Sequence, residues 1–126
     1  MNDLLAALSA DKDWSKLQVE LGIEFDFKCA YCDKDLMASV DNHREWQIDH
    51  IVPTSKHGKD ERDNLALSCR TCNTIKHSWN PLSKCDRPGH PTKQQLIQIA
   101  RTYISGNRES EKIALDRYNA ILAKYR

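Results

Sequence analysis

Two pairs of cysteines have the spacing of metal ligands. Cys29 and Cys32 are separated by two residues, and so are Cys69 and Cys72. A C-x-x-C turn aims two thiolates at one ion, and two such pairs complete the tetrahedron that Zn²⁺ prefers. Four protein ligands leave no open position for water, so we expect a structural zinc that takes no part in hydrolysis.

Other interpretations of the cysteines remain open on the sequence alone. A redox-active C-x-x-C would not need a second copy, and buried inert thiols would not need paired spacing. Cys85 is expected to be the spare thiol of the five, unless it or a nearby histidine replaces a ligand. The 36 residues between Cys32 and Cys69 exceed the usual zinc-ribbon spacing, so a substantial insert separates the two pairs.

This insert and the second cysteine pair contain three further motifs. They are D-H-I-V-P at residues 49–53, N-L at residues 64–65 and C-x-x-C-N-x-x-K at residues 69–76. Together they resemble the H-N-H nuclease family, over about residues 25–79. The resemblance implies a ββα fold built around one metal, and products with 5′-phosphate and 3′-hydroxyl ends.

The resemblance also assigns roles to single residues. Asp49 would ligate the catalytic metal, and His50 would be the general base. Asn64 corresponds to the loop asparagine that orients the imidazole, and Asn73 to the second metal ligand. An asparagine stands at position 73 where many family members have the last histidine, and this variant is familiar in the family.

These residue types suit phosphodiester hydrolysis. A neutral imidazole with a pKa near neutrality can take the proton of an attacking water. The oxygens of Asp49 and Asn73 favour a hard cation, Mg²⁺ or Mn²⁺, which would neutralise charge on the scissile phosphate. His77 is either a third ligand or phosphate contact, or an ordinary exposed histidine. Because neighbouring strand residues point to opposite faces, Asp49 and His50 require a bend or a strand end.

The patterns of apolar residues predict the elements that position this site. We expect a helical lead-in over residues 1–24, with a strand over 23–28, another over 45–52 and a helix over 71–78. Thr92 and Gln95 form a capping box, and we expect a helical hairpin to turn near Gly106. The prediction is a single α+β domain, 1–126, with a core at 25–79 and a basic extension at 80–126.

Charge is unevenly distributed along the chain. The formal net charge of +1 divides into −5 for residues 1–41, +1 for 42–83 and +5 for 84–126. A basic C-terminal third is able to follow a phosphate backbone, although a solvated helix face is an equal alternative. The basic side chains expected to contact phosphates near the site are Lys56, Lys59, Arg62, Arg70 and Lys76.

The function expected from these observations is that of a metal-dependent endonuclease acting on double- or single-stranded DNA. The chain shows no signal peptide and no transmembrane run, so a cytoplasmic location is expected. One alternative is a zinc-dependent module that binds nucleic acid or protein without catalysis. Another is the nuclease effector of a larger phage, restriction or RNA-guided defence complex, which the near-neutral total charge favours.

Overall fold

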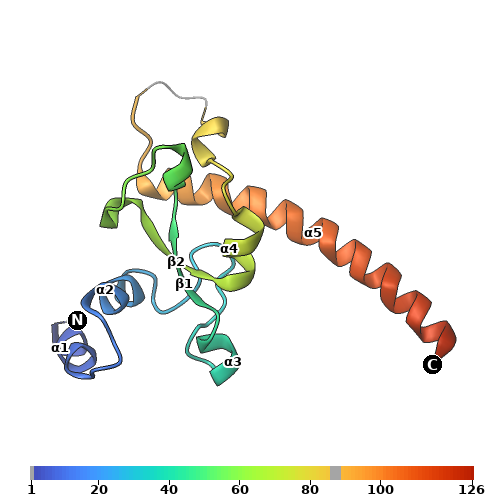
Figure 1. The fold of residues 1–126 in the computed structure, drawn as a ribbon, viewed down its shortest axis with the longest axis horizontal. Coiled ribbons are helices and arrows are strands. Elements are labelled where there is room, and N and C mark those ends of the chain that lie inside the picture. The colour runs from blue at the N-terminus through green and yellow to red at the C-terminus, as the bar shows by residue number, and fades with distance from the viewer. Residues whose placement is uncertain (1, 86–88) are drawn as a thin grey trace.

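The computed structural model describes residues 2–85 and 89–126, and it arranges helices around one small sheet (Figure 1). The elements in chain order are α1 (Asn2–Ala10), α2 (Lys16–Glu24), α3 (Val40–His43), β1 (Trp46–His50), the 3-10 turns η1 (Thr54–Lys56) and η2 (Arg62–Asn64), β2 (Leu65–Cys69), α4 (Arg70–Lys76), the 3-10 turn η3 (Pro81–Lys84) and α5 (Lys93–Tyr125). This confirms the predicted α+β class. Residues 86–88 of the predicted extension lie outside the described part.

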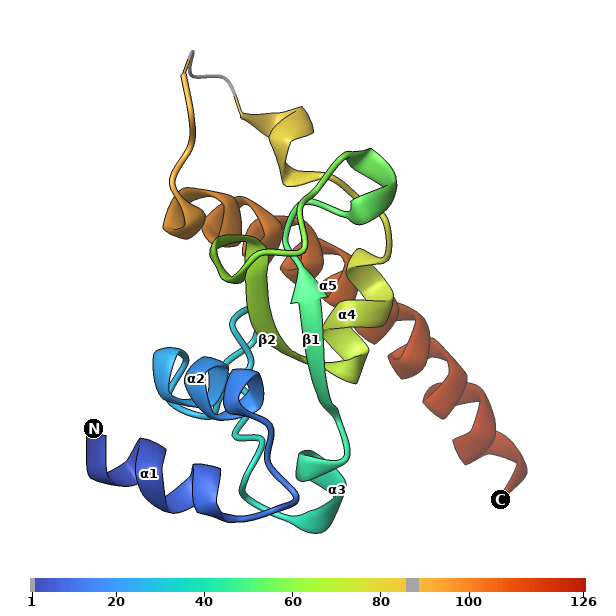
Figure 2. The same ribbon diagram turned by 60° about the vertical axis from the view of Figure 1, so that its left-hand side comes forward.

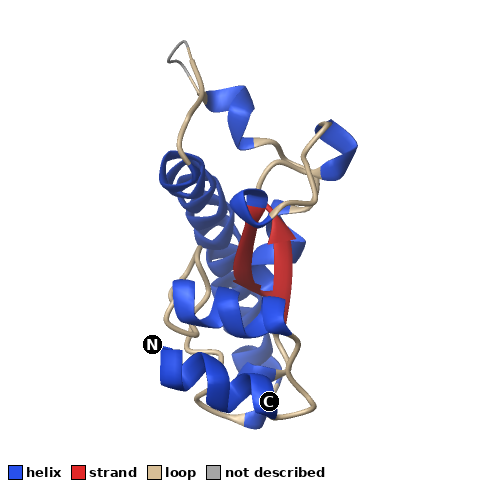
Figure 3. Cartoon of the chain, turned by 90° about the vertical axis from the view of Figure 1, so that its left-hand side faces the viewer, coloured by secondary structure: helices blue, strands red, loops and turns tan. Residues whose placement is uncertain are grey.

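The sheet is an antiparallel pair, β1 and β2, followed directly by α4. Ile48 pairs with Leu67, and His50 pairs with Leu65 at the end of β1. All five residues of β2 are buried, because α2, α4 and the sheet partner surround it. Figures 2 and 3 show the two strands side by side, with α4 against them and α5 crossing behind. The strand end required at His50 is therefore present.

The strand predicted over residues 23–28 is wrong. Helix α2 runs on through Ile23, and Asp26 and Phe27 then have φ angles of 55° and 57°, which a strand does not allow. The Phe27 ring folds back over Gly22, where an added Cβ would lie 2.5 Å from a ring carbon. Tertiary packing therefore outweighs an alternation of only six residues.

The predicted C-terminal hairpin is also wrong, because α5 is one helix of 33 residues. It begins at the predicted capping box, in which Thr92 and Gln95 each accept the other's backbone hydrogen bond. Gly106 costs a helix interior only about 0.5–1 kcal/mol, and helix-forming residues on both sides outweigh that cost. The first half of α5 buries Leu96, Ile97, Ala100 and Ile104, and the second half extends away from the body (Figure 1).

The core joins α2, the sheet and the first half of α5. Leu21, Leu36, Ile51 and Leu67 are fully buried, and Ile104 of α5 closes the same cluster. In the described part of the chain, no helix is long and apolar enough to span a membrane.

Candidate metal centre and active site

The four predicted cysteines meet in one cluster. The Sγ atoms of Cys29, Cys32, Cys69 and Cys72 all lie within 4.8 Å of one another. The Cys32 and Cys69 sulfurs are 3.7 Å apart. A tetrahedral zinc with Zn–S bonds of about 2.3 Å would hold its sulfurs about 3.8 Å apart, so the cluster fits this ion.

Backbone hydrogen bonds hold the two halves of the cluster together. In the first half, Cys29 N donates to Lys34 O at 2.9 Å, and Ala30 N donates to Leu67 O of β2 at 2.8 Å. The second half is the start of α4, where Cys72 N donates to the sulfur of Cys69 at 3.3 Å. The bond from Ala30 to β2 therefore fixes the first pair relative to the second.

A separate cleft of about 450 Å³ contains four of the predicted site residues, and Asn64 is not among the residues that line it. The lining residues from β1 are Ile48, Asp49 and His50; those from the following loop are Pro53, Thr54 and Ser55; those from α4 and its end are Asn73, Thr74, His77 and Ser78. Because α4 packs on β1, side chains far apart in sequence reach one opening. Asp49, His50, Asn73 and His77 are thus brought together around one cleft.

Asp49 is the buried member of this group, with 5% of its surface exposed. Its Oδ2 accepts a hydrogen bond from the Tyr31 hydroxyl at 2.5 Å and lies 3.1 Å from the Lys76 ammonium. Burial raises the pKa of Asp49 above its usual value, and the Lys76 charge opposes that shift. Burial and the Asp49 charge raise the pKa of Tyr31, so Tyr31 remains a hydrogen-bond donor.

The side-chain oxygens of Asp49 and Asn73 fit a hard cation, although Asp49 already has hydrogen-bond partners. A carboxylate has about four lone-pair sites, and Tyr31 and Lys76 leave the Oδ1 of Asp49 with only a long contact, 3.4 Å to Lys76. Asn73 is half-exposed and lines the same cleft. Asp49 and Asn73 could therefore offer oxygen atoms to a divalent ion, as Mg²⁺ prefers.

His50 has a partner that the sequence analysis did not identify. Its Nε2 lies 2.9 Å from the Oδ1 of Asp60, and 32% of its side chain is exposed. A carboxylate that accepts a hydrogen bond from Nε2 would place the ring proton there and leave Nδ1 as the proton acceptor. The backbone of His50 is also fixed, because the Lys76 ammonium donates a hydrogen bond to the His50 carbonyl oxygen at 3.0 Å.

Asn64 acts on the loop after β1 and not on the imidazole. Its amide donates to the carbonyls of Val52 and Lys59, both at 2.9 Å, and its Oδ1 accepts from Val52 N at 2.9 Å. These bonds occupy both amide hydrogens. The predicted orienting role is therefore indirect in this structure, because Asn64 fixes the loop that carries Asp60.

His77 caps α4 and does not extend it. Helix α4 ends at Lys76. The backbone angles of His77 are φ 46° and ψ −122°, a conformation that residues other than glycine rarely adopt. Asn73 and His77 therefore do not share a helix face in the predicted way, although both line the cleft. The His77 Nδ1 is 3.2 Å from the Ser78 hydroxyl.

The five basic residues expected to bind phosphate differ in their exposure and in the partners they already have. Lys56 and Lys59 are exposed in the loop beside the cleft. Arg62 forms ion pairs with α2, and Arg70 donates to the Arg44 carbonyl at 3.1 Å. The prediction for Lys76 is wrong, because its ammonium is fully buried against Asp49.

Tyr31 and Asp60 were missed by the sequence analysis, and the reason is the same for both. Tyr31 reaches a carboxylate 18 positions away, and Asp60 reaches a ring 10 positions away. No local sequence pattern predicts contacts between residues so far apart. Tyr31 does lie between two cysteines of the cluster, Cys29 and Cys32, and that position is the sequence signal that could have drawn attention to it.

Comparison with known protein families finds a match in the central segment of the chain. Residues 29–78 match the family model described as HNH endonuclease, which confirms the resemblance in the motifs. No curated protein and no solved structure matches the chain. The matched segment begins at the first cysteine and ends just after His77, so it contains both the cysteine cluster and the cleft.

Proposed function

We propose that the HNH endonuclease domain at residues 29–78 hydrolyses DNA phosphodiester bonds in the cleft beside His50. The observation that supports this most directly is the meeting of Asp49, His50, Asn73 and His77 around one opening. Each residue type matches a task in hydrolysis. Asp49 and His50 come from β1 and Asn73 and His77 from α4 and its end, two segments that only the fold brings together. HNH nucleases act with a divalent metal, and the donors here favour Mg²⁺ or Mn²⁺.

In this proposal His50 is the general base. Its Nδ1 takes the proton of the attacking water, while Asp60 holds the protonated Nε2 and stabilises the positive charge that the ring acquires. Asp49 and Asn73 hold the divalent ion, which supplies charge neutralisation at the phosphate and leaving oxygen. His77 is a candidate third ligand or phosphate contact at the rim.

Tyr31 and Lys76 position the Asp49 carboxylate. A buried carboxylate without partners would favour its neutral form, which binds cations poorly. The Tyr31 hydroxyl and the Lys76 ammonium both favour the charged form. We expect them to keep Asp49 ionised and to fix its direction toward the cleft.

The four cysteines are proposed to hold a structural zinc, and the exposed Lys56 and Lys59 to contact the DNA backbone. A non-catalytic nucleic-acid-binding module would retain zinc and Lys56 while lacking cleavage. The charge of the whole chain, +1, supports the further proposal that a partner protein or ribonucleoprotein selects the target.

The test compares wild type, His50→Ala and His90→Ala on supercoiled plasmid and on single-stranded DNA, with Mg²⁺, Mn²⁺ or EDTA. His90 is the matched control, because it is an exposed histidine that does not line the cleft. We expect metal-dependent cleavage by wild type and His90→Ala, and a loss of about 10²–10⁴-fold for His50→Ala. Equal cleavage by all three proteins would overturn the catalytic role. Binding of DNA without cleavage under every condition would favour the binding module.

A further inference from the structure

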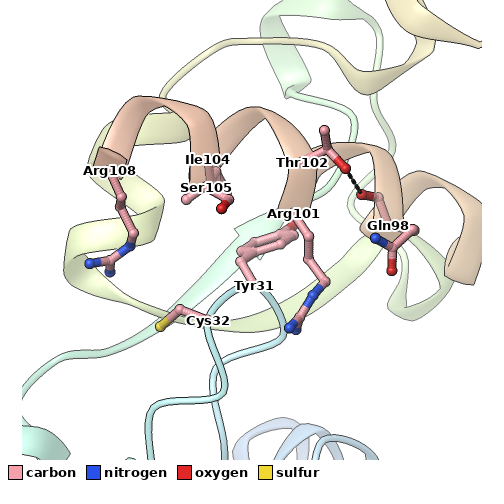
Figure 4. Close-up of a pocket in the computed structure, with 8 residues that line it drawn as sticks. All are labelled: Tyr31, Cys32, Gln98, Arg101, Thr102, Ile104, Ser105 and Arg108. Atoms are coloured by element: carbon pink, nitrogen blue, oxygen red, sulfur yellow. Dashed lines mark hydrogen bonds between the residues drawn. The ribbon is translucent and has the colours of Figure 1, made fainter. Parts of the chain in front are cut away.

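Two arginines of α5 line a cavity of about 480 Å³ together with Cys32 of the cysteine cluster. Arg101 and Arg108 are separated by two helical turns, so they project from one side of α5. Figure 4 shows both side chains extending toward the segment that carries Tyr31 and Cys32. Neither arginine belongs to residues 29–78, so the contact comes from outside the matched segment.

Arg108 contacts the second cysteine pair. Its Nη2 donates to the Cys72 sulfur at 3.2 Å and lies 3.6 Å from the Cys69 sulfur. Its Nε is buried and has no hydrogen-bond partner in the described residues. The half-buried guanidinium keeps its full charge, because arginine does not lose its proton in proteins.

Arg101 contacts the first cysteine pair through its flanking residues. It donates to the Ala30 carbonyl at 2.8 Å and forms a two-point ion pair with the Asp33 carboxylate, at 2.8 and 3.2 Å. The Asp33 charge offsets that of Arg101. Among residues 2–85 and 89–126 no carboxylate forms an ion pair with Arg108, and its guanidinium contacts two of the sulfurs directly.

The chemistry of a four-thiolate zinc explains what such a charge would do. Four thiolates and one Zn²⁺ carry a formal charge of about −2, and the cluster is mostly buried. Buried charge is costly unless it is hydrogen-bonded or opposed by an opposite charge. Donors to the ligand atoms of metal sites commonly change metal affinity by about 10–100-fold.

We propose that Arg108 is a structural part of the zinc site, and that its charge and N–H···S hydrogen bonds retain the ion. Helix α5 is then a component of the metal-binding unit and not an appendage to it. This inference rests on the proposed zinc but not on the proposed hydrolysis. It predicts that zinc retention depends on a residue outside the matched segment.

The experiment measures zinc content and the rate of zinc transfer to a colorimetric chelator. The variants are Arg108→Met, which removes charge and donors, and Arg108→Lys, which keeps the charge but not the forked donors. The matched controls are Arg117→Met and Arg117→Lys, because Arg117 is an exposed arginine farther along α5. We expect Arg108→Met to lose zinc about 10–100-fold faster than wild type, Arg108→Lys to be intermediate and both controls to be unchanged.

The outcomes separate the two proposals. Wild-type protein without zinc would contradict the proposed metal. Zinc in wild type with unchanged release from both Arg108 variants would overturn the role of Arg108 alone. If Arg108→Met does not fold, Arg108→Lys against Arg117→Lys decides, and equal release rates for that pair would overturn the inference.

Discussion

The cysteine cluster and the proposed catalytic cleft lie at opposite ends of the same short helix and hairpin, and they differ in burial, in ligand type and in access to solvent. At the cluster, four sulfurs lie within 4.8 Å and three of the four cysteines are buried. At the cleft, His50 and Asn73 are half-exposed and His77 is exposed. The volume of the cleft is about 450 Å³. One end is closed around its own ligands, and the other is open to a substrate.

The difference indicates that this small domain uses one site for stability, the cysteine cluster, and another for chemistry, the cleft. A closed tetrahedral site offers no position for water, so its contribution is to folding. An open site with oxygen and nitrogen donors can admit water and phosphate. Tyr31 joins the two ends, because it lies between two cysteines and holds the carboxylate of Asp49.

The largest effect should follow from removing one cysteine of the cluster. Cys72→Ser removes one zinc ligand, and structural zinc contributes about 10–16 kcal/mol, as much as the whole stability of a typical domain. We expect no cooperative thermal unfolding by circular dichroism, and no cleavage. Cys85→Ser is the matched control, because Cys85 lies outside the cluster, and it should melt like wild type. A normal melting transition for Cys72→Ser would show that the fold does not need the metal.

A smaller effect should follow from moving the loop beside the cleft. A Cβ added at Gly58 would lie 1.7 Å from the Val52 carbonyl oxygen, so Gly58→Ala must displace the segment that carries Asp60. We expect the cleavage rate to fall about 10²-fold, because small misplacements of catalytic groups are costly, while zinc stays bound. Gly106→Ala is the control, since nothing lies within 4 Å of its Cβ. It should raise the free energy of unfolding by about 0.5–1 kcal/mol without changing cleavage.

The smallest effect should come from the partner of His50. Asp60→Ala removes a hydrogen bond to a carboxylate that is 84% exposed, so solvent replaces much of it. We expect kcat to fall about 2–10-fold with KM and melting temperature unchanged. Asp63→Ala, an exposed carboxylate in the same loop, should match wild type. Identical kcat values for the two variants would remove Asp60 from the mechanism.

Much of the site could be predicted because its motifs are local and chemically specific. The paired cysteines, the D-H segment and the asparagine after the second pair identified the cluster and the cleft residues. The capping box at Thr92 located the start of α5, because it depends only on residues within one helical turn. The strand over 23–28 and the hairpin near Gly106 failed, because short alternation and one glycine are weak local signals that packing overrides.

By itself, the sequence determined which atoms are available: four thiolates, an imidazole, and oxygen donors at the spacing of a known family. Tertiary structure alone decided what each of them contacts. It buried Lys76 against Asp49, turned Asn64 toward the backbone of the loop, paired His50 with Asp60 and placed Arg108 on the sulfurs. The physical reason is that these contacts join residues 10 to 39 positions apart, whose meeting depends on how helices pack on the sheet and not on any local pattern.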